Sequence, residues 1–576
     1  MSDVKTDETT ARKPLRLWPG VVLVAIMWLA RFVVPVFAPD AFAFSVMAGV
    51  FGGAAALILW WVFFSRAEWV ERLGAVVLMV IALFAAPFIL HESIATASQG
   101  MLFIVYAIPP LFLAFVVWAA ATRRLSNFVR RVTMAAAILL SCAAWALARS
   151  DGTTGDFSNE LAWRWTETSE ERLLANADET PTAFAVTTDV EAQWPGFRGP
   201  NRNGVVPGAQ IQTDWTASPP VELWRRPVGP GWSSFTVRGD VFYTQEQRGE
   251  DEIVACYKMS DGELVWRHSD QARFWESIGG AGPRATPTYN NGRLFTLGAT
   301  GIFNALNAND GSVIWKRDLA VDAEVKVPDW GFSSSPLVVD SLVIVAAVGK
   351  LVAYDLATGD PRWFSPKGGY GYSSPHLMII KSVPQILLLS GAGALSVAPF
   401  DGKLLWEHVW PADSRIVQPI LTPNGDLVIG SGFSEGIGTR RIAISQDLGG
   451  WATEERWTSN RLKPYFNDIV MHGGHAYGFD GSIMACIDLA DGKRKWKGGR
   501  YGHGQLVLLP DQDLLLVISE KGNLALVEAA PEKFSEIAKF PAIKGKTWNH
   551  PVLVDDTLLI RNAQEMAAFK LALANN

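Results

Sequence analysis

The sequence predicts a five-helix transmembrane bundle followed by an all-β eight-bladed propeller. Before residue 150 it contains five apolar stretches, each about as long as a helix that crosses a bilayer. Beyond residue 220, tryptophans recur at spacings of 39 to 51 residues, a period typical of propeller blades. Short β-rich runs fill these intervals, as the four strands of an antiparallel blade would. We therefore divide the chain into a transmembrane domain (1–149), a polar acidic linker (150–193) and a propeller (194–576).

The apolar stretches predict five membrane-spanning helices. They run over residues 17–37, 42–64, 73–90, 101–121 and 132–148, and each is long enough for roughly 30 Å of hydrocarbon. Lysines and arginines gather before the first stretch, between the second and third, and between the fourth and fifth, whereas the alternate loops contain none. Because basic loops stay in the cytoplasm, we expect the N-terminus there and the propeller on the opposite side. In a bacterium, this is a multi-pass inner-membrane protein with a periplasmic propeller.

Charge and cysteine content exclude several classes of protein. Residues 1–149 carry 12 basic and 7 acidic residues, which leaves 39 and 50 of the chain's 51 and 57 for the remainder. A soluble part that acidic does not bind nucleic acid through its phosphates. The three cysteines, Cys142, Cys256 and Cys486, are too few and too scattered for a disulfide scaffold or a zinc cluster. The linker is rich in Ser, Thr, Asp and Glu, with one short helix expected around residues 160–175.

The repeat predicts the number of blades and the way the ring closes. Most of the recurring tryptophans stand four residues after a glycine: Trp266, Trp315, Trp363, Trp406 and Trp496. Repeat units open after Gly231, Gly282, Gly331, Gly371, Arg415, Tyr465, Gly502 and Trp548, which makes eight blades. The last unit lacks its Trp strand, and the segment around Trp224, just before the first unit, is a strand of that kind. We expect it to complete the last blade, which removes an open sheet edge.

The turn motif carries a family resemblance. Ala353-Tyr-Asp355, followed by Gly359 and Trp363, resembles the tryptophan-docking repeat of the pyrroloquinoline quinone (PQQ) repeat propellers. The opening segment 194–204 and Gly231-Trp-Ser-Ser-Phe235 are similar to the start of the bacterial PQQ-binding-like propeller proteins. The resemblance covers about residues 194–576. It implies the fold, but this family includes both quinoprotein dehydrogenases and lean scaffolds that resemble the outer-membrane assembly propeller lipoprotein. The layout of five spans before eight blades resembles membrane-bound quinoprotein glucose dehydrogenase.

The same resemblance implies where a cofactor would lie, over the face at which the innermost strands begin. Aligned units place polar side chains at one level there: Ser234, Thr286, Ser335, Ser374, Gln418, Asp468, His503 and His550. PQQ needs cations for its carboxylates, an indole for its flat face and oxygen ligands for a bridging Ca²⁺. The candidates are Arg284, Trp330, Arg415, Asn467, His503, Trp548, Asn549 and His550, with Asp468 or Asp329 as general base. The alternative is a water-filled channel with a polar lining.

Other features weaken an enzymatic interpretation. The chain has no pair of adjacent cysteines and no long inserted loops, both of which are common in dehydrogenases of this family. His472 and His475 are three residues apart and could bind a metal. Their position in the repeat matches the hairpin turn at Asn290–Arg293, so we interpret them as part of a surface turn.

Two functions remain open. The first is a membrane-anchored periplasmic module that binds or scaffolds a protein or ligand and needs no cofactor. The second is a PQQ-dependent dehydrogenase, with Ca²⁺, that oxidises an alcohol or sugar and reduces membrane quinone. Both functions have the lipid bilayer as a partner. The first has a periplasmic or membrane protein as its further partner, and the second has membrane quinone. The weak catalytic signal favours the first, whereas four helices beyond a single anchor favour the second.

Overall fold

Five long helices in the N-terminal part of the chain confirm the predicted spans. The computed structural model describes residues 15–37, 45–155, 159–175, 184, 190–432 and 436–574. The chain divides into an N-terminal unit, Met1–Thr153 with Asn159–Thr166, and a C-terminal unit, Thr154–Ser158 with Glu167–Asn576. Within the described residues, five helices of 20 or 21 residues are apolar enough to cross a membrane: Trp18–Phe37, Ser45–Phe64, Trp69–Phe88, Met101–Ala121 and Asn127–Leu147.

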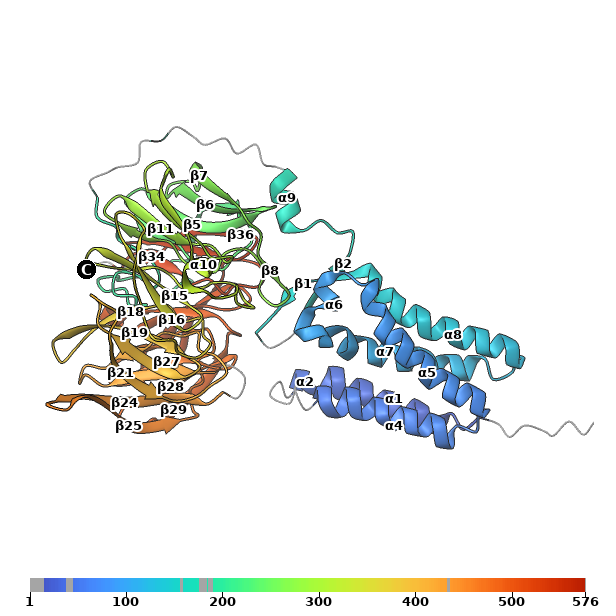
Figure 1. Ribbon diagram of the computed structural model, residues 1–576. Helices are drawn as coiled ribbons and strands as arrows, with labels where there is room; N and C mark the ends of the chain where they lie inside the picture. The colour runs from blue at the N-terminus through green and yellow to red at the C-terminus, as the bar shows by residue number, and fades with distance from the viewer. Residues whose placement is uncertain are drawn as a thin grey trace, which may run out of the picture. The chain divides into compact units, whose positions relative to one another are not determined.

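Most spans combine α-helix with short π or 3₁₀ segments, and Figure 1 labels their α-helical parts. The first contains α1 (Trp18–Trp28), η1 (Leu29–Val33) and α2 (Val34–Phe37), and the second η3 (Ser45–Gly52), α4 (Gly53–Leu59) and η4 (Trp60–Phe64). The third contains α5 (Trp69–Ala85) and η5 (Ala86–Phe88), the fourth α7 (Met101–Ala121), and the fifth α8 (Asn127–Ala143) and η7 (Ala144–Leu147). Between the third and fourth spans lie α6 (Glu92–Ala95) and η6 (Ala97–Gly100).

A buried ion pair joins α5 and α8. Nε and Nη2 of Arg130 each donate to the Glu71 carboxylate at 3.1 Å, and both side chains are buried. The Arg130 guanidinium also lies 5.1 Å from the Trp118 ring centroid. An isolated charge inside an apolar bundle is costly, so this pairing holds the two helices in register.

The segment after the fifth span differs from the single helix expected around residues 160–175. Strands β1 (Ala148–Thr153) and β2 (Asn159–Trp163) pair antiparallel there, and of the residues that the structure describes in this segment only α9 (Ser169–Ala175) is helical. The helix begins at a capping box, in which the Glu171 N–H donates to Thr168 Oγ1 (3.0 Å) and the Thr168 N–H donates to the Glu171 carboxylate (2.6 Å). Backbone pairing with β1 makes the preceding residues a strand.

The C-terminal unit contains eight four-stranded antiparallel sheets, which confirms the predicted propeller (Figure 1). The first two blades are β4 (Thr236–Arg238), β5 (Val241–Arg248), β6 (Asp251–Lys258), β7 (Leu264–Gln271), and β10 (Thr288–Asn290), β11 (Arg293–Leu297), β12 (Ile302–Asn307), β13 (Val313–Asp318). The next two are β14 (Leu337–Val339), β15 (Leu342–Ala347), β16 (Lys350–Asp355), β17 (Pro361–Phe364), and β18 (His376–Ile380), β19 (Val383–Ser390), β20 (Gly393–Val397), β21 (Leu404–Val409).

The other four blades follow in the same order. They are β22 (Ile420–Leu421), β23 (Leu427–Ser431), β24 (Gly438–Asp447), β25 (Gly450–Ser459), then β26 (Val470–His472), β27 (His475–Asp480), β28 (Ile483–Asp488), β29 (Arg494–Arg500). Next come β30 (Gln505–Leu509), β31 (Leu514–Ile518), β32 (Asn523–Glu528), β33 (Glu536–Pro541), and finally β34 (Val552–Val554), β35 (Thr557–Arg561), β36 (Glu565–Lys570). Connecting loops hold β8 (Trp275–Glu276), β9 (Gly280–Ala281), α10 (Leu319–Ala323) and η8 (Pro510–Gln512).

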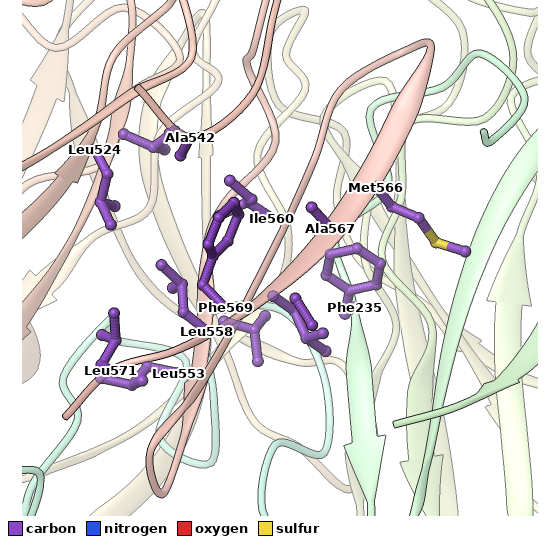
Figure 2. Close-up of a cluster of buried hydrophobic side chains, with 14 of the residues drawn as sticks. Phe235, Leu524, Ala542, Leu553, Leu558, Ile560, Met566, Ala567, Phe569 and Leu571 are labelled. Atoms are coloured by element: carbon purple, nitrogen blue, oxygen red, sulfur yellow. The ribbon is translucent and has the colours of Figure 1, made fainter. Parts of the chain in front are cut away.

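The ring closes as the sequence predicts, because an N-terminal strand completes the last blade. Strand β3 (Val221–Pro227) pairs antiparallel with β36, and Trp224 lies opposite Ala568. The core at this closure combines three blades (Figure 2): Leu558, Ile560 and Phe569 belong to the last blade, Leu524 to the preceding one and Phe235 to the first. Burial of this cluster therefore ties the two ends of the ring together.

Each glycine turn is the docking site for the tryptophan of the preceding blade. A Cβ added at Gly359 would lie 2.6 Å from the Trp315 ring, and one at Gly402 would lie 2.4 Å from Trp363. Only a glycine allows that approach, and the positive φ of +77° at Gly359 requires it as well. The indole N–H completes the contact by donating to a carbonyl of the next blade, as Trp315 does to Leu356 (3.2 Å).

Trp406 departs from this pattern. Its indole N–H donates to Oε1 of Gln385 in its own blade (2.7 Å). The next blade has no glycine four residues before its own tryptophan, Trp457, so its turn does not offer the same docking site.

Candidate binding site on the propeller axis

A belt of hydrogen bonds joins the residues that open the innermost strands. At these positions, the backbone N–H of one blade donates to a side-chain oxygen of the next. The pairs are Ser234 to Thr286 (3.0 Å), Thr286 to Ser335 (3.0 Å), Ser335 to Ser374 (2.9 Å) and Gln418 to Asp468 (2.6 Å). The carboxylate of Asp468 thus takes the place that hydroxyl groups have elsewhere in the belt.

The segment 194–206 lies across the propeller and contacts five blades. Trp194 pairs with Val237, the Pro195 carbonyl accepts from Tyr289 N–H (2.8 Å), and Val206 N–H donates to the Leu508 carbonyl (2.8 Å). Arg202 donates to the carbonyls of Ser335 (3.0 Å) and Pro336 (2.8 Å), and Arg198 donates to that of Ile469 (3.0 Å). We name this segment the plug. Two buried guanidinium groups of the plug therefore bind backbone carbonyls of the third and sixth blades.

Arg198 pairs with the predicted general base. Its Nη1 lies 3.6 Å from Oδ1 of Asp468, and both side chains are almost completely buried. Burial raises the pKa of Asp468, an effect that the Arg198 guanidinium opposes. His550 lies 3.7 Å from the other carboxylate oxygen, and burial together with Arg198 lowers its pKa to about 3. The histidine is thus neutral at neutral pH, and Arg198 is the counter-ion of Asp468.

Two buried histidines, His550 and His376, lead us to expect that the free energy of unfolding decreases in acid. Burial and the nearby Arg202 and Arg198 lower the pKa of His376 from 6.5 to about 3, as for His550. Between these pH values the unfolded chain binds protons that the folded chain does not. The free energy of unfolding should therefore decrease from pH 6.5 to pH 3, by up to about 1.4 kcal/mol per pH unit and histidine.

Urea unfolding of the full chain in detergent at several pH values measures this slope. We expect His376→Gln, which cannot be protonated, to have a shallower decrease than the unchanged chain. Equal slopes for the two proteins would contradict a neutral, buried His376.

Above the belt lies a cavity of about 190 Å³ to which all eight blades contribute, and which we name the axial cavity. Seven of its lining residues are aromatic: Phe197, Trp232, Trp330, Tyr372, Tyr465, Phe466 and Trp548. The rings contact one another, with centroids 4.8 Å apart for Trp232 and Trp548, 4.8 Å for Phe466 and Trp548, and 5.0 Å for Trp330 and Tyr372. Ser374, Gln418, Asp468 and His550 carry the polar atoms of the belt into the same cavity.

The charged groups that line the axial cavity are engaged by the protein itself. Nη2 of Arg284 lies 3.2 Å from the Glu276 carboxylate and also donates to the Gly280 carbonyl (2.7 Å). Its other nitrogens donate to the carbonyls of Ala281 and Trp330. Glu276 in turn accepts from the N–H groups of Ile278 and Gly279. With Asp468 paired to Arg198, the cavity is electrically balanced.

The structure brings together half of the residues predicted for this site. Asp468, Arg284, Trp330, Trp548 and His550 line the axial cavity, and Asp329, Arg415, Asn467, His503 and Asn549 are not among its lining residues. Asp329 is exposed, and its backbone N–H donates to the Tyr370 hydroxyl (3.1 Å).

The other four have structural contacts. Buried Arg415 donates to the carbonyls of Ser390 and Trp410. Asn467 donates to the Gly504 carbonyl, and Asn549 to that of Ser233 (2.7 Å). The His503 ring stacks on Phe466 with centroids 5.6 Å apart.

Most of the aromatic lining was absent from the sequence-based candidates. Tyr465 and Phe466 lie just before the predicted belt, and their position in the repeat could have identified them. Phe197 comes from the plug, whose sequence motif indicates a family but does not indicate where the segment lies on the propeller. Glu276 and Ile278 lie in a loop of the first blade that has no counterpart in the repeat.

The flat aromatic side chains of the lining suit the ring system of PQQ, but the charged side chains of the lining do not suit its carboxylates. Three indoles could contact a planar ring system. A cofactor with carboxylates also needs unengaged cations, and Arg284 already has a carboxylate and three carbonyls as partners. In the part of the chain that the structure describes, no three His, Cys, Asp or Glu side chains form a group that could hold a metal ion. The residues present therefore do not match a PQQ–calcium site.

His472 and His475 lie in the hairpin turn that the repeat predicts. They pair at the end of β26 and β27, where His472 contacts Asp513 (2.5 Å) and Nδ1 of His475 contacts the Gly473 carbonyl (2.8 Å). Cys142, Cys256 and Cys486 are buried and form no disulfide.

Comparisons with known proteins agree with the sequence motifs. A family model described as "Outer membrane protein assembly factor BamB" matches residues 250–498. BamB of Burkholderia pseudomallei (strain K96243) is 23% identical over 369 residues, which cover 59% of this chain and 88% of that protein. A quinohemoprotein alcohol dehydrogenase of Pseudomonas putida HK5 has 13% identity and a TM-score of 0.48, with 67% of this chain and 81% of that chain covered. BamB of Moraxella catarrhalis has 13% identity and a TM-score of 0.43, with coverages of 61% and 100%. The resemblance to the PQQ-repeat propellers, BamB among them, is thus confirmed.

Proposed function

We propose that this protein is a membrane-anchored binding or scaffold module whose axial cavity receives an uncharged, partly apolar group of a partner. The observation that carries this proposal is the charge balance of the cavity, in which Arg284 pairs with Glu276 and Asp468 with Arg198. Aromatic walls with a few polar groups are typical of binding pockets. Gln505 lines the cavity, and its Oε1 is buried without a hydrogen-bond partner among the described residues, so a donor on the bound group that reaches this atom would satisfy it.

The partner in this proposal is a periplasmic or membrane protein. The basic loops of the bundle support an inner membrane location with the propeller in the periplasm. The relatives from Burkholderia pseudomallei and Shewanella oneidensis are both named outer membrane protein assembly factor, which supports a protein partner for this chain as well.

The alternative is a PQQ-dependent dehydrogenase that passes electrons to membrane quinone. The layout of spans and blades and the indoles of Trp232, Trp330 and Trp548 favour it. It would require Arg284 to leave four partners in favour of the cofactor, and Asp468 to act as a base despite its pairing with Arg198. The other base candidate, Asp329, is exposed and is not a lining residue of the cavity.

Site-specific photocrosslinking in the producing cells tests the binding function. A photoreactive phenylalanine at Tyr465, in the cavity wall, should yield a discrete protein adduct, whereas the same group at exposed Ile379 should not. Trp548→Ala should lower the yield at position 465 about tenfold, as the loss of a central aromatic contact does. Adducts of equal yield at both positions, or no adduct from Tyr465, would contradict the proposal.

A further inference from the structure

The β1–β2 hairpin has an exposed apolar face. Leu161 and Trp163 alternate along β2, so their side chains share one side of the strand, and Trp165, in the turn that follows, stacks on Trp163. They are 45%, 58% and 68% exposed, and the two indoles stack with centroids 5.2 Å apart. A contiguous exposed face of this kind indicates an interaction surface.

Backbone pairing places this face at the end of the fifth span. Trp163 lies opposite Ala148, the residue directly after the span. The next backbone N–H, that of Arg164, donates to the carbonyl of Leu147, the last residue of the span (2.8 Å). Both indoles therefore lie at the depth where the apolar helix ends.

The hairpin is fixed to the bundle at this depth. Ser150 N–H donates to Oγ of Ser93 in α6 (2.9 Å), and Arg149 is buried and lies 3.1 Å from Asp151. Strands β1 and β2 accordingly lie beside α6 in Figure 1. The bond from Ser150 to Ser93 and the packing of β1 on α6 hold β1 against the bundle, whereas Leu161, Trp163 and Trp165 remain exposed.

We propose that this face lies in the headgroup region of the leaflet in which the fifth span ends, so that the hairpin contacts lipid outside the spans. Indoles concentrate at that depth because one edge is apolar and the N–H finds polar partners. Arg164, exposed between the two tryptophans, meets lipid phosphates there. Leu147, 49% exposed, continues the lipid-facing surface of the fifth span up to the hairpin.

Spin labels on the full chain in phosphatidylcholine–phosphatidylglycerol vesicles test this inference. Trp163→Cys and Trp165→Cys are labelled separately, and the buried native cysteines permit selective labelling. The matched control is Glu160→Cys, exposed on the other side of the same strand. At positions 163 and 165 we expect collisions with dissolved oxygen to exceed those with a water-soluble nickel chelate, as for groups about 5 to 10 Å into the interface. At position 160, collisions with the nickel chelate should exceed those with oxygen.

Two results would overturn the proposal. Equal nickel accessibility at positions 160, 163 and 165 would place the face in water. Shielding of positions 163 and 165 from both reagents would mean that protein covers it. Each single variant keeps the other tryptophan, so a folding defect of one still leaves the second as a test.

Discussion

Trp315→Ala lowers the free energy of unfolding of the propeller by about 3 to 5 kcal/mol in our account. The indole is almost fully buried, packs on Phe303 and Tyr354 with centroid distances of 5.2 and 6.4 Å, and donates to the Leu356 carbonyl. Its removal leaves a cavity above Gly359 and takes away one of the two hydrogen bonds that the Leu356 carbonyl accepts from the preceding blade, where Arg293 is the other donor. Pulse proteolysis of the full chain in detergent, over a series of urea concentrations, measures the loss.

Ile314→Ala is the matched control for this change. The residue is the immediate neighbour on β13, but its side chain is 43% exposed, so its truncation should cost much less. Equal losses for the two variants would contradict the view that tryptophan docking joins the blades.

The second large effect is expected at the ion pair below the axial cavity. Arg198→Met leaves the Asp468 carboxylate buried without its counter-ion, and we expect a loss of about 3 to 5 kcal/mol. Asp468→Asn keeps an oxygen for the Gln418 N–H and is expected to cost less. In the double variant neither charge remains, so its loss should be smaller than that of Arg198→Met alone.

The same unfolding assay completes this double-mutant cycle. Losses that simply add up would contradict a direct pairing of Arg198 with Asp468. The cycle also separates a structural role of Asp468 from a catalytic one, because a base that only acts on a substrate would not be coupled to Arg198 in stability.

The fold could be predicted because its signals are local and repeated. Five apolar stretches define the spans by length, and the spacing between Gly359 and Trp363 follows from direct packing between neighbouring blades. The pairing of β1 with β2 was missed because it depends on contacts with α6 that the local sequence does not indicate.

The site could be predicted only in part. Asp468 and His550 were identified because their level in the blade follows from the repeat. The partners that determine their chemistry come from outside the repeat: Arg198 from the plug and Glu276 from a loop. Residues such as Arg415 and Asn549 lie just before that level in the sequence, but they donate to backbone carbonyls, and this orientation depends on the surrounding fold.

Equilibrium titration of the full-length protein with PQQ and calcium tests the central claim most directly. If the charges of the axial cavity are satisfied within the protein, no binding occurs at micromolar cofactor, and no alcohol or sugar reduces an added dye. Stoichiometric binding that is lost in Arg284→Ala, together with dye reduction that is lost in Asp468→Asn, would contradict the account and establish the dehydrogenase.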